Sequence, residues 1–350
     1  MFSTKRTLFL IIFLITHTAN LRAENPPVPK KTRQLAIDVT EMSHGTYDDA
    51  FKIAKAVGIE RVGLFLMWNV LEPSPHKFDT KFLDIAAIYY PPQHVKIDLT
   101  LAVVNTNHRV APSDLMDRPF SDPEVIKRFK KLIDLVFSKL KPDQLASVNI
   151  GSEYDKLFGT DQKQWAQFAT FYKSARDYLK LKWPSTIVAT ETTYEGIIGT
   201  ERNTIKEINK HSDVIGISYF GIQSDISVID PKKVHEVFDL VCLIYPGRRI
   251  YFYQFGYPTS DLLNSSPLKQ KLFVEESFIG WDNHADQIQL IDYTWLHDHS
   301  PESVNEILKI YNFFIPKFRS FIATLGLRTY SGQDKPAFLS LRTAARARGW

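Results

Sequence analysis

The sequence predicts an α/β protein built as a single (β/α)8 barrel, a closed ring of parallel strands surrounded by helices. Three observations support this fold class. Short runs rich in β-forming residues alternate along the chain with helical segments. The strand cores are almost continuously apolar, as in Val62, Leu64 and Leu66, which indicates a parallel sheet covered on both faces. The length of 350 residues suits one such barrel.

Eight runs are expected to form the strands of the ring. They are residues 34–39, 61–68, 95–104, 146–151, 186–190, 214–219, 249–255 and 288–295. Between them lie segments with helical periodicity, most clearly residues 123–140, where Val125, Phe129 and Val136 fall on one stripe. We expect Ser121 to cap that helix. Later helices are expected to begin at Asp161, Ser300 and Asp230 with Pro231.

A doubly wound sheet that binds a dinucleotide is the alternative with the same alternation. That fold carries a glycine-rich phosphate loop after its first strand. Residues 40–45 read TEMSHG and hold no glycine cluster, so the barrel is favoured and nucleotide binding is unsupported. No repeat, linker or charge block divides the chain, and residues 34–341 are predicted to form one domain.

The N-terminus has the pattern of a secretory signal peptide over residues 1–23. Lys5 and Arg6 precede a short apolar run, and Ala23 supplies a small residue for cleavage. The run is too short to span a bilayer in the mature protein, although an uncleaved anchor is the alternative. Residues 24–33 are expected to form an extended leader and residues 342–350 a basic tail. We therefore expect a secreted or periplasmic protein with no membrane partner after cleavage.

Charge and cysteine content exclude several classes of site. The formal charge is +4, and loss of Lys5, Arg6 and Arg22 with the signal leaves +1, which gives no electrostatic case for a nucleic-acid partner. The chain has 1 cysteine, Cys242, so neither an internal disulfide nor a multi-cysteine zinc site is available. No full ligand set for a metal is evident. We expect no metal and no cofactor.

Polar and aromatic side chains follow most of the predicted strands. Barrel enzymes build their sites at this carboxyl end of the ring. Aromatic faces suit the C–H surfaces of sugar rings, and polar side chains suit sugar hydroxyls, so a carbohydrate ligand is expected. The candidate residues are Trp68, Asn105, Asn107, Ser152, Glu153, Glu191, Tyr219, Gln254, Tyr257 and Trp295.

Several of these residues lie in motifs that resemble those of clan A glycoside hydrolases, the (β/α)8 superfamily that includes endo-galactanases and many β-glycanases. Gly151-Ser152-Glu153 resembles the strand-four motif that supplies the acid/base. Gln254-Phe255-Gly256-Tyr257-Pro258 resembles the strand-seven motif that supplies the nucleophile. Further matches, in chain order, are Trp68 with Glu72-Pro73 and Phe78-Asp79, Tyr219, Trp295, and Lys335-Pro336-Ala337.

The resemblance covers most of the mature chain and implies hydrolysis of a β-linked poly- or oligosaccharide. It implies that Glu153 is the general acid/base. Trp68, Tyr219 and Trp295 would hold the sugar, and Tyr257 would line the same site. Asn105 and Asn107 would bind hydroxyl groups.

Two positions next to the reacting carbon depart from the clan's pattern. Gln254 stands where the nucleophilic glutamate belongs, and a neutral amide is a poor nucleophile. Ser152 replaces an asparagine that, by resemblance, would contact the sugar 2-hydroxyl. The two carboxyl groups that a glycosidase needs are therefore not both supplied by the motifs.

Three explanations remain open. A second carboxylate is supplied from another strand, Glu191 first, with Asp292, Asp298 and Asp261 behind it. Alternatively, a group of the substrate acts as nucleophile while Glu153 is the acid. The third explanation is a catalytically lapsed barrel that binds glycan without cutting it. A barrel with unrelated chemistry is a weaker fourth reading, because this fold hosts many reactions.

Overall fold

A computed structural model describes residues 26–350 as a closed parallel barrel, the fold class predicted from the sequence. The predicted signal segment lies outside the described residues. The barrel strands are β1 (Gln34–Ile37), β2 (Arg61–Met67), β3 (Lys96–Asn105), β5 (Leu145–Ser152), β6 (Val188–Ala189), β7 (Glu191–Thr193), β8 (Ile215–Tyr219), β9 (Ile250–Phe255) and β10 (Ile288–Tyr293). A short strand β4 (His108–Arg109) folds back antiparallel on the end of β3.

The ring closes through an interrupted fifth strand. Neighbouring strands follow the order β6-β5-β3-β2-β1-β10-β9-β8-β7. The two ends of that order, β6 and β7, are separated in the chain only by Thr190, so they share one place in the ring. Each of the eight predicted runs contributes to this ring, and the strands in it pair in parallel.

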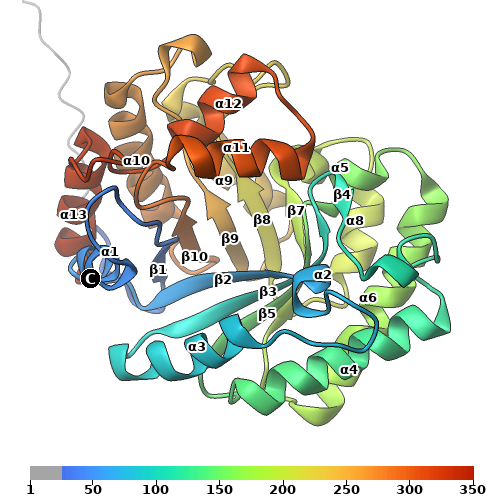
Figure 1. Cartoon of the computed structure of the whole chain (residues 1–350). Helices are drawn as coiled ribbons and strands as arrows, with labels where there is room; N and C mark the ends of the chain where they lie inside the picture. The colour runs from blue at the N-terminus through green and yellow to red at the C-terminus, as the bar shows by residue number, and fades with distance from the viewer. Residues whose placement is uncertain (1–25) are drawn as a thin grey trace, which may run out of the picture.

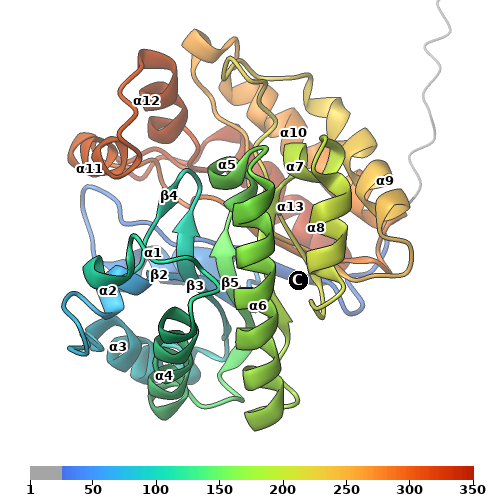
Figure 2. The ribbon, with the colours of Figure 1, turned by 90° about the vertical axis from the view of Figure 1, so that its right-hand side faces the viewer.

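Helices surround the ring, as Figures 1 and 2 show from two directions. They are α1 (Tyr47–Lys55), α2 (Trp68–Leu71), α3 (Lys81–Tyr89), α4 (Pro123–Lys139), α5 (Tyr154–Phe158), α6 (Gln162–Lys182), α7 (Tyr194–Ile198), α8 (Arg202–Asn209), α9 (Val234–Ile244), α10 (Pro267–Asn283), α11 (Pro301–Tyr311), α12 (Pro316–Ala323) and α13 (Pro336–Arg348). Helices α11 and α12 do not cover a side of the ring but lie across the end to which the strands point.

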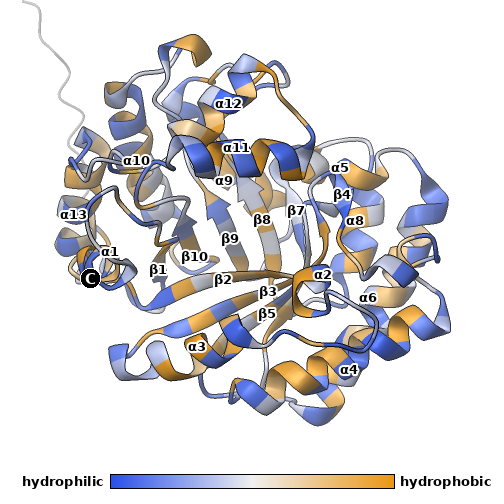
Figure 3. Ribbon diagram, viewed as in Figure 1, coloured by the Kyte–Doolittle hydropathy of each residue, from blue (hydrophilic) through white to orange (hydrophobic). Residues whose placement is uncertain are grey.

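Helix α4 confirms the predicted apolar stripe and corrects its predicted cap. Val125, Phe129 and Val136 are each 0% exposed, and the alternation of hydrophobic and hydrophilic residues along the helix is visible in Figure 3. The cap is Asp122 rather than Ser121. Asp122 has extended backbone geometry, and its carboxylate accepts the backbone N–H of Glu124 at 2.8 Å. Ser121 lies one residue too far from the first turn.

The other predicted helix starts are confirmed. The carboxylate of Asp161 accepts two backbone N–H groups at the start of α6. The hydroxyl of Ser300 accepts the backbone N–H of Ser303 at 3.1 Å and begins α11. Asp230 caps the 3₁₀ turn Pro231–Lys233, which leads into α9.

Both ends of the described part of the chain pack against α10. Arg33, in the segment predicted as a leader, is 0% exposed and pairs with Asp282 at 2.8 Å. The residues predicted as a separate basic tail instead continue α13 as far as Arg348. They are ordered there because Arg348 also pairs with Asp282, at 2.7 Å, and because Trp350 stacks on Trp281 at 5.2 Å between ring centroids.

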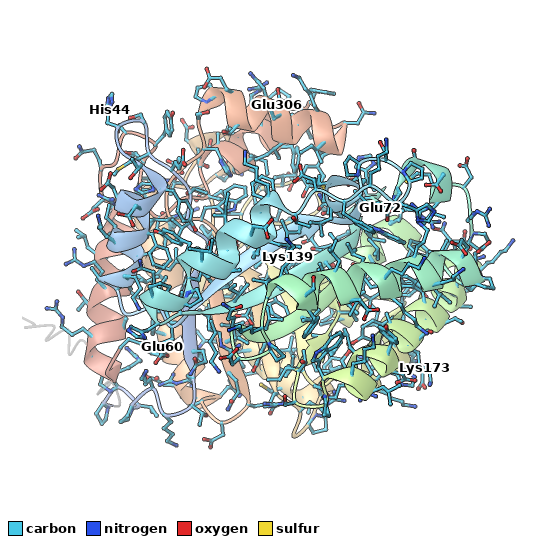
Figure 4. All side chains as sticks on the ribbon, turned by 60° about the horizontal axis from the view of Figure 1, so that its bottom comes forward. His44, Glu60, Glu72, Lys139, Lys173 and Glu306 are labelled. Atoms are coloured by element: carbon cyan, nitrogen blue, oxygen red, sulfur yellow. The ribbon has the colours of Figure 1, made fainter. Side chains whose placement is uncertain are left out.

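The two ends of the ring differ in the loops and helices that they carry. Figure 4 places the loop with His44 and helix α11 with Glu306 at one end, and Glu60, which precedes β2, toward the other. The His44 end is the carboxyl end of the strands, where long loops follow β1, β3 and β10. Within residues 26–350, none of the helices combines the length and apolar character needed to cross a bilayer.

Candidate active site

A cavity of about 910 Å³ opens at the carboxyl end of the barrel. Each position of the ring contributes at least one side chain at or near its strand end. These side chains include Asp38, Met67, Asn105, Glu153, Glu191, Tyr219, Gln254 and Trp295. Site residues that are far apart in the sequence therefore meet in one cleft, as the barrel topology predicts.

Glu153 follows β5 directly and is held by hydroxyl groups from two other strands. Its backbone is left-handed, with φ of 51°. The hydroxyl of Thr106 donates to Oε2 at 2.6 Å, and the hydroxyl of Ser218 donates to Oε1 at 2.5 Å. Thr106 also has a φ of 51°, which is an uncommon conformation for a β-branched residue. Such strain persists only where the surroundings enforce it, which is typical of functional sites.

Glu191, the first residue of β7, is the most enclosed carboxyl group near Glu153. It is 1% exposed, and its backbone carbonyl accepts the N–H of Glu153 at 3.0 Å. Ser152 Oγ and Asn149 Nδ2 donate to Oε2 at 2.9 and 3.3 Å. Burial, followed by the charge of Glu153, raises the pKa of Glu191 to about 8 despite these donors. Glu191 therefore holds a proton at neutral pH.

Gln254 completes this network from β9, which is separated from the strand of Glu191 by β8. Its Nε2 donates to Oε1 of Glu191 and to Oγ of Ser152, each at 3.2 Å. The side chain lines the same cleft as Glu153, so residues 153 and 254 face one cavity. An amide at this position supplies donors to Glu191 where a third carboxylate would repel it.

The floor of the cleft carries three further acids, of which Asp98 and Asp292 are buried and Asp38 is partly buried. Asp38, Asp98 and Asp292 line its lower part, and Gly63 makes room for them, since a Cβ there would collide with the Asp38 carboxylate. Burial, with the charge of Asp98 second, raises the pKa of Asp38 to about 7. Burial likewise raises the pKa of Asp292. Of the three, Asp98 is the one paired with a cation, Arg61 at 3.2 Å.

Four more of the sequence-predicted residues line the cleft. Asn105 and Asn107 lie at the end of β3, and Tyr219 and Trp295 lie on the other side of the ring. Asn105 accepts a hydrogen bond from the hydroxyl of Tyr311 at 3.2 Å. The ring of Trp295 meets His299 edge to face, at 4.0 Å between centroids.

Three predicted ligand residues take other places. Trp68 is 1% exposed because the chain turns into α2 directly after β2, and its indole packs against Phe129 of α4 instead of entering the cleft. Tyr257 is also 1% exposed, and its hydroxyl donates to the carbonyl of Ile229 at 2.6 Å. Ser152 lies beneath the cleft wall, where it holds Glu191 and Gln254 rather than presenting its hydroxyl to a ligand.

The strand-two acid Glu72 belongs to the scaffold. It is 1% exposed, accepts the indole N–H of Trp68 at 2.9 Å and pairs with Arg128 of α4. Figure 4 labels it beside α4. The remaining candidate acids are also accounted for, since Asp298 pairs with Lys335 at 2.7 Å and Asp261 begins a 3₁₀ turn, Asp261–Leu263.

Sequence reasoning missed three residues that organise the site. Thr106 and Ser218 lie at predicted strand ends, but no sequence motif distinguishes them from other hydroxyl-bearing residues. Tyr311 lies at the end of α11, and no motif marks it. Only the folded ring brings all three beside Glu153. Across residues 26–350, no group of three or more His, Cys, Asp or Glu side chains is arranged to hold a metal ion.

Comparisons with known proteins place the fold more firmly than the function. No protein-family model matches the chain, and no curated protein matches it. Several solved structures, in contrast, match its fold. A GH5_18 protein from Streptomyces cattleya in complex with Manβ1-4GlcNAc shares 14% identity at a TM-score of 0.70, over 90% of this chain and 80% of that one.

Two further structures extend the likeness. An exo-β-1,4-mannosidase from Opitutaceae bacterium strain TAV5 shares 17% identity at a TM-score of 0.69, over 90% of this chain and 59% of that one. A family 39 glycoside hydrolase from Bacteroides cellulosilyticus WH2 shares 10% identity at a TM-score of 0.62, over 91% of this chain and 65% of that one. These likenesses confirm the predicted (β/α)8 barrel as the fold of this chain.

Proposed function

We propose that the chain is a glycoside hydrolase that cleaves a β-linked oligo- or polysaccharide, with Glu153 and Glu191 as its two carboxyl groups. The observation that carries the proposal is their presence in one cleft, where burial and the charge of Glu153 raise the pKa of Glu191. Two carboxyl groups in unlike environments are what acid-catalysed glycoside cleavage needs. The likeness to barrels named as β-mannosidases and glycoside hydrolases supports the same reaction class.

Glu153 is proposed as the general acid/base because it lies closer to the open cleft than Glu191. Burial, with the charge of Glu153 second, raises the pKa of Glu191 to about 8, which favours a proton on Glu191 in the free protein. When a glycosidic oxygen contacts Glu153, the proton moves from Glu191 to Glu153, which donates it to the oxygen of the leaving group. Glu191 is then left ionised and takes the place of the carboxylate that position 254 lacks.

The other cleft residues fit a sugar ligand. Trp295 supplies aromatic surface, and Asn105 and Asn107 supply amide groups for hydroxyls. Tyr219 borders the cleft but is 2% exposed, so it supports the wall rather than stacking on a sugar. Gln254 keeps Glu191 oriented and can bond a sugar hydroxyl through its amide oxygen. No metal or other cofactor is part of this proposal.

The test is the hydrolysis of a panel of β-glycosides, beginning with β-mannosides and Manβ1-4GlcNAc, by the wild type and two variants. Glu153→Gln and Glu191→Gln should each reduce kcat by roughly 10³-fold or more, while calorimetry still detects binding. Glu195→Gln is the matched control, since Glu195 lines the same cleft outside the network of Glu191. The Glu195→Gln substitution should reduce kcat by less than tenfold. Wild-type turnover by either of the first two variants would overturn the assignment.

A binding protein without turnover is the second candidate, favoured by Gln254 and Ser152 at the two altered positions. It requires that the wild type binds a glycan and releases no product from it. Turnover that appears only in Gln254→Glu would support this lapsed enzyme. Any turnover by the wild-type protein excludes it.

Export is also proposed, from the signal pattern over residues 1–23. Expression in a bacterium with the complete leader should yield a periplasmic or secreted product that begins near Glu24. Edman sequencing of the product checks this. A cytoplasmic product that retains Met1 would contradict it.

A further inference from the structure

The cleft has a second wall that the proposed chemistry does not use. It is formed by the connection after β10, which contains α11 and α12 and crosses the carboxyl end of the barrel. Apart from His299 and Tyr311, the side chains that this connection turns into the cleft are apolar. They include Ile307, Ile310, Phe313, Phe318, Phe321 and Leu325, and we call them the roof wall.

The roof wall begins beside the candidate acid. The hydroxyl of Tyr311 lies 3.5 Å from the hydroxyl of Thr106, which itself donates to Glu153. From Tyr311, aromatic rings follow one another across the opening. Phe318 lies 5.5 Å from Tyr311 between centroids, Phe321 lies 6.1 Å from Phe318, and Phe220 at the end of β8 lies 5.4 Å from Phe321.

Part of this wall faces solvent although it is strongly apolar. Ile310 is 43% exposed and Phe313 is 40% exposed, and both line the cleft. The adjoining Phe314 and Ile315 are 59% and 42% exposed, and the turn that they form is hydrophobic in Figure 3. Exposed apolar surface gathered at a cleft is typical of a ligand-binding region.

Polar and apolar groups are therefore separated within one cavity. The acids Glu153, Glu191, Asp38 and Asp292 lie on the floor and at the strand ends, whereas none of the roof-wall residues carries a charge. A pure oligosaccharide would leave the roof wall without a matching surface. A molecule with a sugar at one end and an apolar group at the other matches both parts.

We propose that the substrate is a β-glycoside with an apolar aglycone, an alkyl or aryl group that leaves from Glu153 along the roof wall. This inference rests on the proposed function and specifies its substrate class. The continuity of the roof wall with Thr106 and Glu153 fixes the order, sugar on the floor and aglycone on the roof wall. Each methylene group that is fully buried there should raise affinity about threefold to fourfold.

The test is the affinity of Glu153→Gln for methyl and n-octyl β-D-mannopyranoside and β-D-glucopyranoside, measured by calorimetry below the micelle-forming concentration. The octyl compound should bind at least tenfold more tightly than its methyl counterpart. Ile310→Ser and, separately, Phe313→Ser should reduce that ratio to about threefold or less. Ile88→Ser is the matched control, because Ile88 is also an exposed isoleucine on a helix, 76% accessible, but lies on α3 outside the cleft lining. It should leave the ratio unchanged.

Equal affinity for the methyl and octyl compounds would overturn the inference. So would an octyl preference that Ile310→Ser and Phe313→Ser both leave intact. Cosedimentation with phosphatidylcholine vesicles that contain no glycoside, lost in Ile310→Ser, would also overturn it, because the roof wall would then be a bilayer-docking surface. An octyl preference in a protein that hydrolyses none of the β-glycosides in the panel would instead refute the proposed function and leave the roof wall as a binding site for the apolar group.

Discussion

Glu191 shows how burial and a neighbouring charge set the chemistry of one residue. It is 1% exposed beside Glu153, and its pKa is raised to about 8 by burial first and by that charge second. In the unfolded chain the same group ionises near its ordinary value of 4.5. Between these two pH values the unfolded state releases a proton that the folded state keeps. Ionisation of Glu191 therefore destabilises the fold progressively from pH 4.5 to pH 8.

Glu191→Gln should remove this pH dependence. A glutamine cannot ionise, so the variant should gain stability relative to the wild type between pH 5 and pH 8, by on the order of 3 kcal/mol. Urea unfolding at both pH values measures the difference. The control is Glu306→Gln on the exposed face of α11, where the same change should shift stability equally at both pH values. Identical pH dependence of wild type and Glu191→Gln would show that Glu191 is charged in the folded protein.

At the scale of single elements, hydropathy and capping chemistry predict most of the fold. The eight strands were predictable because each is an apolar run between polar turns, and α4 because its apolar residues recur at helical spacing. The cap of α4 was misplaced by one residue, since Ser121 and Asp122 both suit the position by type. The geometry decides between them, because only Asp122 reaches the N–H of Glu124.

The cap offers a paired test. Asp122→Ala removes the acceptor for a backbone N–H that has no partner inside the helix, and it should lower Tm by roughly 1–3 °C. Ser121→Ala, next to it in the chain, should leave Tm within about 1 °C. Thermal melts monitored by circular dichroism compare them. The cap assignment fails if Ser121→Ala is the more damaging substitution.

In the candidate site, only the residues whose positions are set by the strand ends of the ring could be predicted from the sequence. Strand-end positions such as Glu153, Glu191 and Gln254 meet because parallel strands share one carboxyl end. Trp68 lies elsewhere because the direction of a side chain after a strand depends on the turn that follows, here α2. The roof wall could not be predicted, because the sequences of α11 and α12 indicate helices but not the part of the barrel against which they pack.

At the scale of the whole molecule, the two ends of the described chain, residues 26–350, are joined through α10. Arg33 near the N-terminal end of the described chain and Arg348 at the end of α13 share one acid, Asp282 of α10. The guanidinium of Arg33 also lies over the rings of Trp281 and Trp350, at 5.1 and 5.4 Å. Arg33 is fully buried, so its charge depends on this partner.

Asp282→Asn should therefore destabilise the protein strongly. It leaves two largely buried guanidinium groups without a counter-charge, at a cost of about 3–5 kcal/mol. Asp286→Asn is the matched control, because Asp286 pairs with Lys31 at 3.4 Å on the surface, with its side chain 92% exposed. Its effect should lie within about 0.5 kcal/mol. Urea unfolding measures both, and similar small effects would show that the chain ends do not stabilise the barrel.

The pH dependence of kcat/KM on a hydrolysed β-glycoside tests the whole account most directly. Cleavage by Glu153 and Glu191 requires one proton on the two carboxyl groups together, and that proton leaves at about pH 8. The account predicts that kcat/KM falls above pH 8, about tenfold for each further pH unit. A rate that stays level or increases between pH 7 and pH 10 would contradict it, since the carboxyl groups would then work without the proton that the barrel holds for them.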